Sequence, residues 1–107
     1  MGANETLYDD ADKLKDAGKL DEAVEKLNQI LADDATYALA HSALAVIYTR
    51  LAKHDLAVTH ALKTCDLEPE DPFSFTALSV TFMRAGKIPE AEDAMARARM
   101  MQGGHRH

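Results

Sequence analysis

Apolar residues recur along this chain at intervals of three and four positions, which is the spacing of amphipathic helices and not the alternation of strands. Leu7, Ala11 and Leu14 share one helical face near the start of the chain. The answering face of the next stretch comprises Ala23, Leu27, Ile30 and Leu31. The pattern predicts six helices, at about 4–17, 21–33, 37–51, 55–67, 72–85 and 89–101.

The whole pattern repeats with a fixed period, which is the strongest architectural signal a sequence can carry. Gly18, Ala52 and Gly86 are each followed by lysine and lie 34 residues apart. Three further columns align in the same register, namely Ala23, Ala57 and Ala91, then Leu14, Tyr48 and Phe82, then Ala11, Ala45 and Ser79. Small residues facing large ones let paired helices approach closely. We therefore expect a single domain over 1–107, built of helix-turn-helix units at about 4–37, 38–71 and 72–102.

Proline and aspartate mark the expected helix ends. Asp71 is a good N-cap, and Pro72 after it stands in the first turn, where its missing N–H is not needed. Pro89 begins another helix in the same way. Pro69 ends the helix before it, because proline disfavours a helical residue immediately in front of it.

The repeat resembles the tetratricopeptide repeat family over nearly the whole chain. In the third unit the matching residues are Phe75, Leu78, Ser79, Phe82, Gly86, Ala91 and Ala98. In the second they are Leu44, Ala45, Tyr48, Ala57 and Pro69, whereas His41 and Ala61 depart from the family pattern. The first unit has Asp10 where a leucine is expected. The resemblance implies an all-α fold, an α-solenoid of three units in a right-handed superhelix, with a concave groove that binds a peptide or protein segment.

Helical geometry indicates which side chains face that groove, because they lie opposite the packing residues. In the second and third units these are Leu39, Ser42, Val46, Thr49 and Arg50, then Phe73, Thr76, Val80, Met83 and Arg84. In the first unit they are Glu5, Tyr8, Asp12, Lys15 and Asp16. An open helical face is usually polar, so the apolar members predict a floor for a partner's hydrophobic side chains, with the two arginines pairing a carboxylate. The alternative is that some of them pack between repeats.

Some members of the family hold the C-terminal carboxylate of a chaperone in a clamp of two lysines, two asparagines and an arginine. The corresponding positions here are Tyr8, Asp12, Ala43, Phe73 and Ala77. Since none of the five is retained, we expect no binding of Hsp70- or Hsp90-type tails.

Composition narrows the choice of partners. The net charge of −6 and the pI near 5.2 argue against nucleic acid, whose binding depends on clustered basic side chains. The longest apolar runs are far shorter than the ~20 residues of a membrane span. The start of the chain lacks the features of a secretory signal, and Cys65 is a lone cysteine, so we expect a cytoplasmic protein without membrane contact.

No pattern predicts catalysis. His54 and His60 are expected on different sides of one helix, and His41 at a packing position. Residues 103–107 form an expected flexible tail, whose two histidines leave a tetrahedral metal site half filled. Cys65 is expected to be buried. We therefore predict a protein that is not an enzyme and has no cofactor and no structural metal.

The last predicted helix offers a competing role. It carries Met95, Met100 and Met101, and methionine is common at adaptable binding surfaces. Arg99 stands where the earlier units have Leu31 and Cys65, as in a helix partly converted into a polar cap. The alternative hypothesis is therefore a homo-oligomeric scaffold that self-associates through this helix or through the groove.

Overall fold

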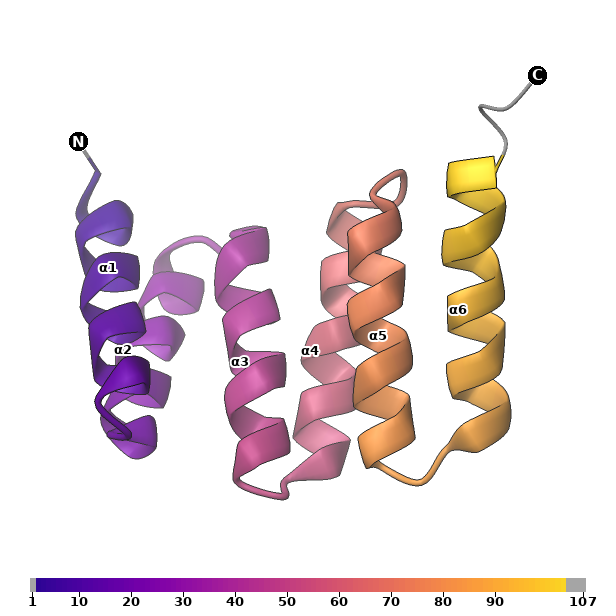
Figure 1. Ribbon diagram of the computed structural model, residues 1–107. Coiled ribbons are helices and arrows are strands. Elements are labelled where there is room, and N and C mark those ends of the chain that lie inside the picture. Colours follow the sequence, from indigo (N-terminus) through magenta and orange to yellow (C-terminus); the bar gives the residue numbers. More distant parts are fainter. Residues whose placement is uncertain (1, 104–107) are drawn as a thin grey trace.

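The computed structural model describes residues 2–103, which form three pairs of antiparallel helices stacked side by side (Figure 1). The helices are α1 (Ala3–Asp16), α2 (Leu20–Asp33), α3 (Ala38–Arg50), α4 (His54–Leu67), α5 (Pro72–Arg84) and α6 (Ile88–Gly103). The predicted all-α solenoid is confirmed, and the predicted boundaries lie within two residues of these. The tail at 104–107, with both of its histidines, lies outside the described residues. None of the described helices is long and apolar enough to cross a membrane.

The turn inside each pair is the same Schellman turn, used three times. In the first, Lys19 N donates to Leu14 O at 2.8 Å and Gly18 N to Lys15 O at 3.0 Å. The residue before each lysine adopts a left-handed conformation, with φ of +80° at Gly18, +78° at Gly86 and +59° at Ala52. The 34-residue column of small residues is thus explained by backbone conformation, and alanine is the strained member.

We expect Ala52→Gly to stabilise the protein. A left-handed non-glycine residue costs about 1–2 kcal/mol, and glycine gives back about 0.5–1 kcal/mol through the entropy of the unfolded chain. The net gain in the free energy of unfolding is therefore about 0.5–1 kcal/mol. Urea denaturation measures it, with Gly86→Ala as the reverse change. Equal or lower stability of Ala52→Gly would show that the turn does not carry this strain.

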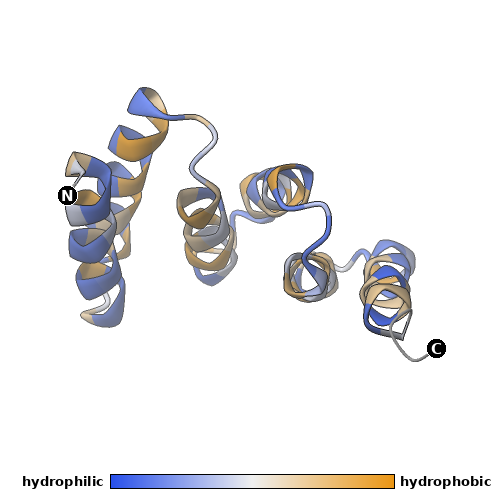
Figure 2. Ribbon diagram, turned by 90° about the horizontal axis from the view of Figure 1, so that it is seen from above, coloured by the Kyte–Doolittle hydropathy of each residue, from blue (hydrophilic) through white to orange (hydrophobic). Residues whose placement is uncertain are grey.

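The core runs the length of the stack in two clusters that meet at the middle pair. The first joins α1 to α4, and its largest fully buried side chains are Leu27, Ile30, Leu44 and Ile47. The second joins α3 to α6 and comprises Ala45, Ala61, Cys65, Phe75, Leu78, Ala94 and Ala98. From above, apolar colouring gathers where neighbouring helices face one another (Figure 2). The stack therefore depends on junctions between successive pairs as much as on the pairs themselves.

The start of α5 is fixed as the sequence predicts. The Asp71 carboxylate accepts a hydrogen bond from Phe73 N at 2.9 Å, and Pro72 occupies the first turn. This cap sets where α5 begins against α4, and so places the α5 side chains that face α3.

Candidate functional site

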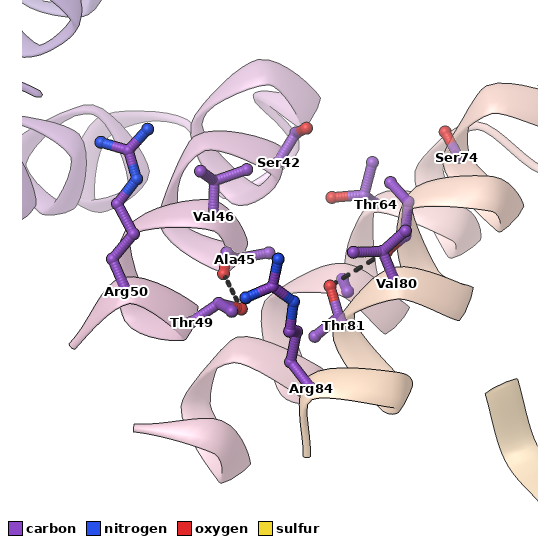
Figure 3. Close-up of a pocket in the computed structure, with 12 residues that line it drawn as sticks. Ser42, Ala45, Val46, Thr49, Arg50, Thr64, Ser74, Val80, Thr81 and Arg84 are labelled. Carbon is purple, nitrogen blue, oxygen red and sulfur yellow. Dashed lines mark hydrogen bonds between the residues drawn. The ribbon is translucent and has the colours of Figure 1, made fainter. Parts of the chain in front are cut away.

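A concave pocket of about 480 Å³ opens between α3 and α5, with α4 behind it (Figure 3). Its walls come from corresponding positions of two successive repeats, since Ser42, Val46 and Arg50 of α3 lie 34 residues before Thr76, Val80 and Arg84 of α5. The lining residues are Ser42, Ala45, Val46, Thr49, Arg50, Ala61, Thr64, Ser74, Ala77, Val80, Thr81 and Arg84. Their small size leaves the volume open.

The three threonines add little polarity to the pocket, because each hydroxyl is used within its own helix. Thr49 Oγ1 donates to Ala45 O at 2.8 Å, and Thr81 Oγ1 to Ala77 O at 3.0 Å (Figure 3). Thr64 Oγ1 donates to His60 O at 3.0 Å. Together with the alanines they give a largely apolar floor, and Val46 and Val80 stand over it with about half of their surface exposed.

Two arginines supply the charge at one end of the pocket. Arg50 is the last residue of α3 and Arg84 the last of α5, and both are exposed. A basic residue in the last turn interacts favourably with the helix dipole, which accounts for part of their placement. Within residues 2–103 the one ion pair is Lys15 with Asp12, at 3.2 Å, so neither guanidinium has an acidic partner there. Both are available to a carboxylate from outside.

The structure distributes the predicted groove residues unevenly. Five of them line the pocket together with Thr49, namely Ser42, Val46, Arg50, Val80 and Arg84. Leu39, Phe73 and Met83 lie on the same helices outside its lining, with 56, 72 and 49% of their surface exposed. Such exposure contradicts the alternative that these side chains pack between repeats. They extend an apolar surface from the pocket along the open side of α3 and α5.

The remaining predicted positions differ from those of the pocket. Tyr8 is partly buried against Tyr37, with ring centroids 6.4 Å apart, and burial raises the pKa of its hydroxyl. Asp12 is exposed and pairs with Lys15. Thr76 is partly buried and its hydroxyl donates to Pro72 O at 3.1 Å. None of these three lines the pocket.

Half of the lining could not be assigned from the helical register alone. Ala45 was expected to pack inside, and it does so while also reaching the pocket. Ala61 and Thr64 belong to α4, the second helix of a pair, and become accessible because α3 and α5 leave room between them. Ser74, Ala77 and Thr81 are small residues, which carry no signal in an apolar pattern.

The histidines form a contact that the sequence interpretation missed. His41 and His60, on α3 and α4, approach with their Nδ1 atoms 2.9 Å apart, and Tyr48 stacks on His60. His41 Nε2 lies 2.9 Å from Ala35 O. A carbonyl can only accept, so His41 Nε2 carries a proton, and one further proton must lie between the two Nδ1 atoms. Doubly protonated rings would lose this bond.

The histidine pair predicts that stability falls in mild acid. Partial burial, and then the neighbouring His41, lower the pKa of His60 below its ordinary 6.5. The unfolded chain therefore binds a proton more readily, and the free energy of unfolding declines as the pH falls below 6.5. Denaturation at pH 7.5 and at successively lower pH should show a steeper decline for the native chain than for His60→Gln. Identical pH profiles would contradict this prediction.

Other reactive groups of the described region are occupied structurally. Cys65 is buried, its Sγ donates to Ser74 O at 3.4 Å, and burial raises the pKa of the thiol to about 11. A thiol with this pKa is a poor nucleophile at neutral pH. In residues 2–103, His, Cys, Asp and Glu side chains do not gather in groups of three or more that could hold a metal ion.

The arrangement of helices is similar to that of several solved structures. A crystal structure of MamA matches with a TM-score of 0.86 at 20% identity, over 94% of this chain and 59% of MamA. The second TPR of Spaghetti (RPAP3), bound to the HSP90 peptide SRMEEVD, matches at 0.82 and 19%, over 92 and 91%. The Yersinia enterocolitica type III secretion chaperone SycD, in complex with a peptide of the translocator YopD, matches at 0.83 and 18%, over 91 and 74%.

These similarities establish the fold, and the chain spans about three fifths of the length of MamA. No protein-family model and no curated protein sequence matches the chain.

Proposed function

We propose that this chain, whose fold is that of three tetratricopeptide repeats, is an adaptor that binds a segment of another protein along the groove between α3 and α5. The observation that carries the proposal is the joint presence of an open, largely apolar pocket and of two exposed arginines without an acidic partner in residues 2–103. Apolar surface supplies affinity and the cations supply orientation. Two of the similar structures were solved with peptides bound, which supports a peptide ligand here.

The chemistry of the pocket describes the segment that would fit. A volume of about 480 Å³ holds one or two large side chains, and the walls of Val46 and Val80 favour aliphatic or aromatic ones. A carboxylate a short distance along the segment would meet Arg50 and Arg84. The expected ligand is therefore a short linear segment with an apolar anchor beside an acidic residue, and binding requires no catalysis or cofactor. The lone buried thiol is compatible with the cytoplasm, which we propose as its place of action.

Selection from a library of random displayed peptides tests the proposal. Peptides enriched on the native chain should combine apolar and acidic residues, and their binding should weaken at least about tenfold in the variant Arg50→Glu/Arg84→Glu. The matched control is Lys53→Glu/Lys63→Glu, which changes the net charge equally at exposed lysines outside the pocket lining. Equal losses in the two variants would show that net charge alone governs binding, and no enrichment would contradict a peptide-binding role.

The ligand is expected to differ from a chaperone tail. Of the five clamp positions, Phe73 is an exposed aromatic residue, Ala77 lines the pocket, and Tyr8 is partly buried. None can donate the charged hydrogen bonds that a terminal carboxylate needs. A peptide ending in Glu-Glu-Val-Asp should therefore show no binding by calorimetry up to high micromolar concentrations, and micromolar affinity would contradict this expectation.

A further inference from the structure

The two junctions between successive helix pairs are built from the same two positions of the repeat. At the first junction, Leu31 of α2 and Leu44 of α3 belong to one core cluster. At the second, Cys65 of α4 and Leu78 of α5 belong to one cluster, and the Cys65 thiol reaches the start of α5. Each pair of positions is 34 residues beyond the last. The second helix of one unit thus contacts the first helix of the next in a fixed register.

The same register places two opposite charges at the two ends of the stack. One step beyond Cys65 is Arg99 of α6, and one step before Leu44 is Asp10 of α1. Arg99 is exposed, Asp10 is partly buried, and neither forms an ion pair within residues 2–103. In these residues α1 and α6 are the outermost helices, so their outer faces have no neighbouring helix (Figure 1).

We propose that these outer faces join copies of this chain head to tail, with Arg99 of one copy paired to Asp10 of the next. The joint would be a third junction in the register of the first two, with an ion pair in place of the apolar pair. Around Asp10, Leu7 and Leu14 are partly buried and occupy the positions of Phe75 and Phe82, so α1 retains the apolar character of an internal first helix. Met95 supplies adaptable apolar surface on α6, at the position of Ala61.

The distribution of charge selects the polarity of the joint. Residues 1–34 contain ten acidic and four basic side chains, whereas residues 69–107 contain five of each. Two copies meeting through their first units would bring two strongly acidic surfaces together. A head-to-tail joint sets the acidic unit against a neutral one and lets the two buried charges neutralise each other. Such a joint is heterologous, so it propagates into open chains of copies and does not stop at a dimer.

A competing explanation is that Asp10 and Arg99 only keep the two ends soluble. Charges with that role need not match in sign or position, whereas a joint requires opposite signs at facing positions. Asp10→Arg and Arg99→Asp separate the two, because each variant alone would set like charges against each other at every joint. In a mixture, the unchanged Arg99 of the first variant would meet the unchanged Asp10 of the second. The two substituted positions would also meet with opposite signs, so alternating copies would restore the pairing.

Sedimentation velocity on the 107-residue chain, from about 10 to 500 µM at about 0.1 M ionic strength, tests the proposal. We expect the average mass to rise with concentration beyond that of a dimer, each single variant to associate at least about tenfold more weakly, and their equimolar mixture to recover most of the association. Asp9→Arg and Lys87→Asp are the charge-matched controls at exposed positions, and should associate like the native chain. Circular dichroism verifies that each variant is folded.

Three results would overturn the proposal. The first is a native chain that stays monomeric over the whole range. The second is a mixture no more associated than its components. The third is an Asp9→Arg control as weak as Asp10→Arg, which would assign the effect to net charge. Because Val80 lies in the groove and not on these outer faces, Val80→Asp should leave the association unchanged; loss in that variant would place self-association in the groove.

Discussion

Replacing Ala91 with leucine is expected to lower the free energy of unfolding by about 1–3 kcal/mol or more. Ala91 is fully buried, as are Ala23 and Ala57 at the same position of the other units. A closely packed interior cannot hold three more carbon atoms without moving the helices of the pair apart. Against a total stability of about 5–15 kcal/mol this is a large fraction. Thermal denaturation should show a fall in Tm of about 10–20 °C.

Ala96→Leu is the control for this prediction. It makes the same chemical change in the same helix, α6, at an exposed position. Leucine and alanine have similar helix propensities, so the change in stability should stay within about 0.5 kcal/mol. Ala57→Leu should behave like Ala91→Leu. If the variants at the buried and exposed positions had equal stability, the column of small residues would not be needed for packing.

Replacing Val80 with aspartate is expected to weaken binding of a selected groove peptide by at least about tenfold. Val80 lines the pocket and is half exposed, so the acidic side chain adds little strain to the free protein. In the complex it removes apolar contact and places a carboxylate where the ligand would be desolvated, which is costly. Fluorescence anisotropy with a labelled peptide measures the change.

Leu62→Asp is the matched control, because Leu62 is an exposed aliphatic residue of α4 outside the pocket lining. It should leave peptide affinity within about twofold of the native chain, since surface changes away from a site have small effects. Equal affinity of the native chain and Val80→Asp would place the binding surface elsewhere on the molecule.

The fold was predictable from sequence because its signals are local and repeated three times. The turn residues, the Asp71 cap and the apolar spacing each act within a few residues, and the 34-residue period averages out their local errors. The strain at Ala52 was hidden for the opposite reason. Alanine fits a column of small residues by size, and only the backbone shows that this column requires a left-handed conformation.

The site was predictable in part because it depends on contacts between helices. Helical periodicity placed Val46, Val80 and both arginines on the open side of α3 and α5. It could not show that Ala61 reaches the pocket from α4, since this depends on how far apart α3 and α5 stand. The contact between His41 and His60 was missed in the same way, because their own helices place them independently and only helix packing brings them together.

The measurement that tests the central claim most directly is chemical-shift mapping by NMR of the labelled chain with a selected peptide. The groove account predicts that the largest perturbations fall on residues lining the pocket, above all Val46, Thr49, Val80 and Arg84, with small changes on the exposed residues of α2 and α6. Perturbations centred on α2 or α6, with those of α3 and α5 unchanged, would contradict it.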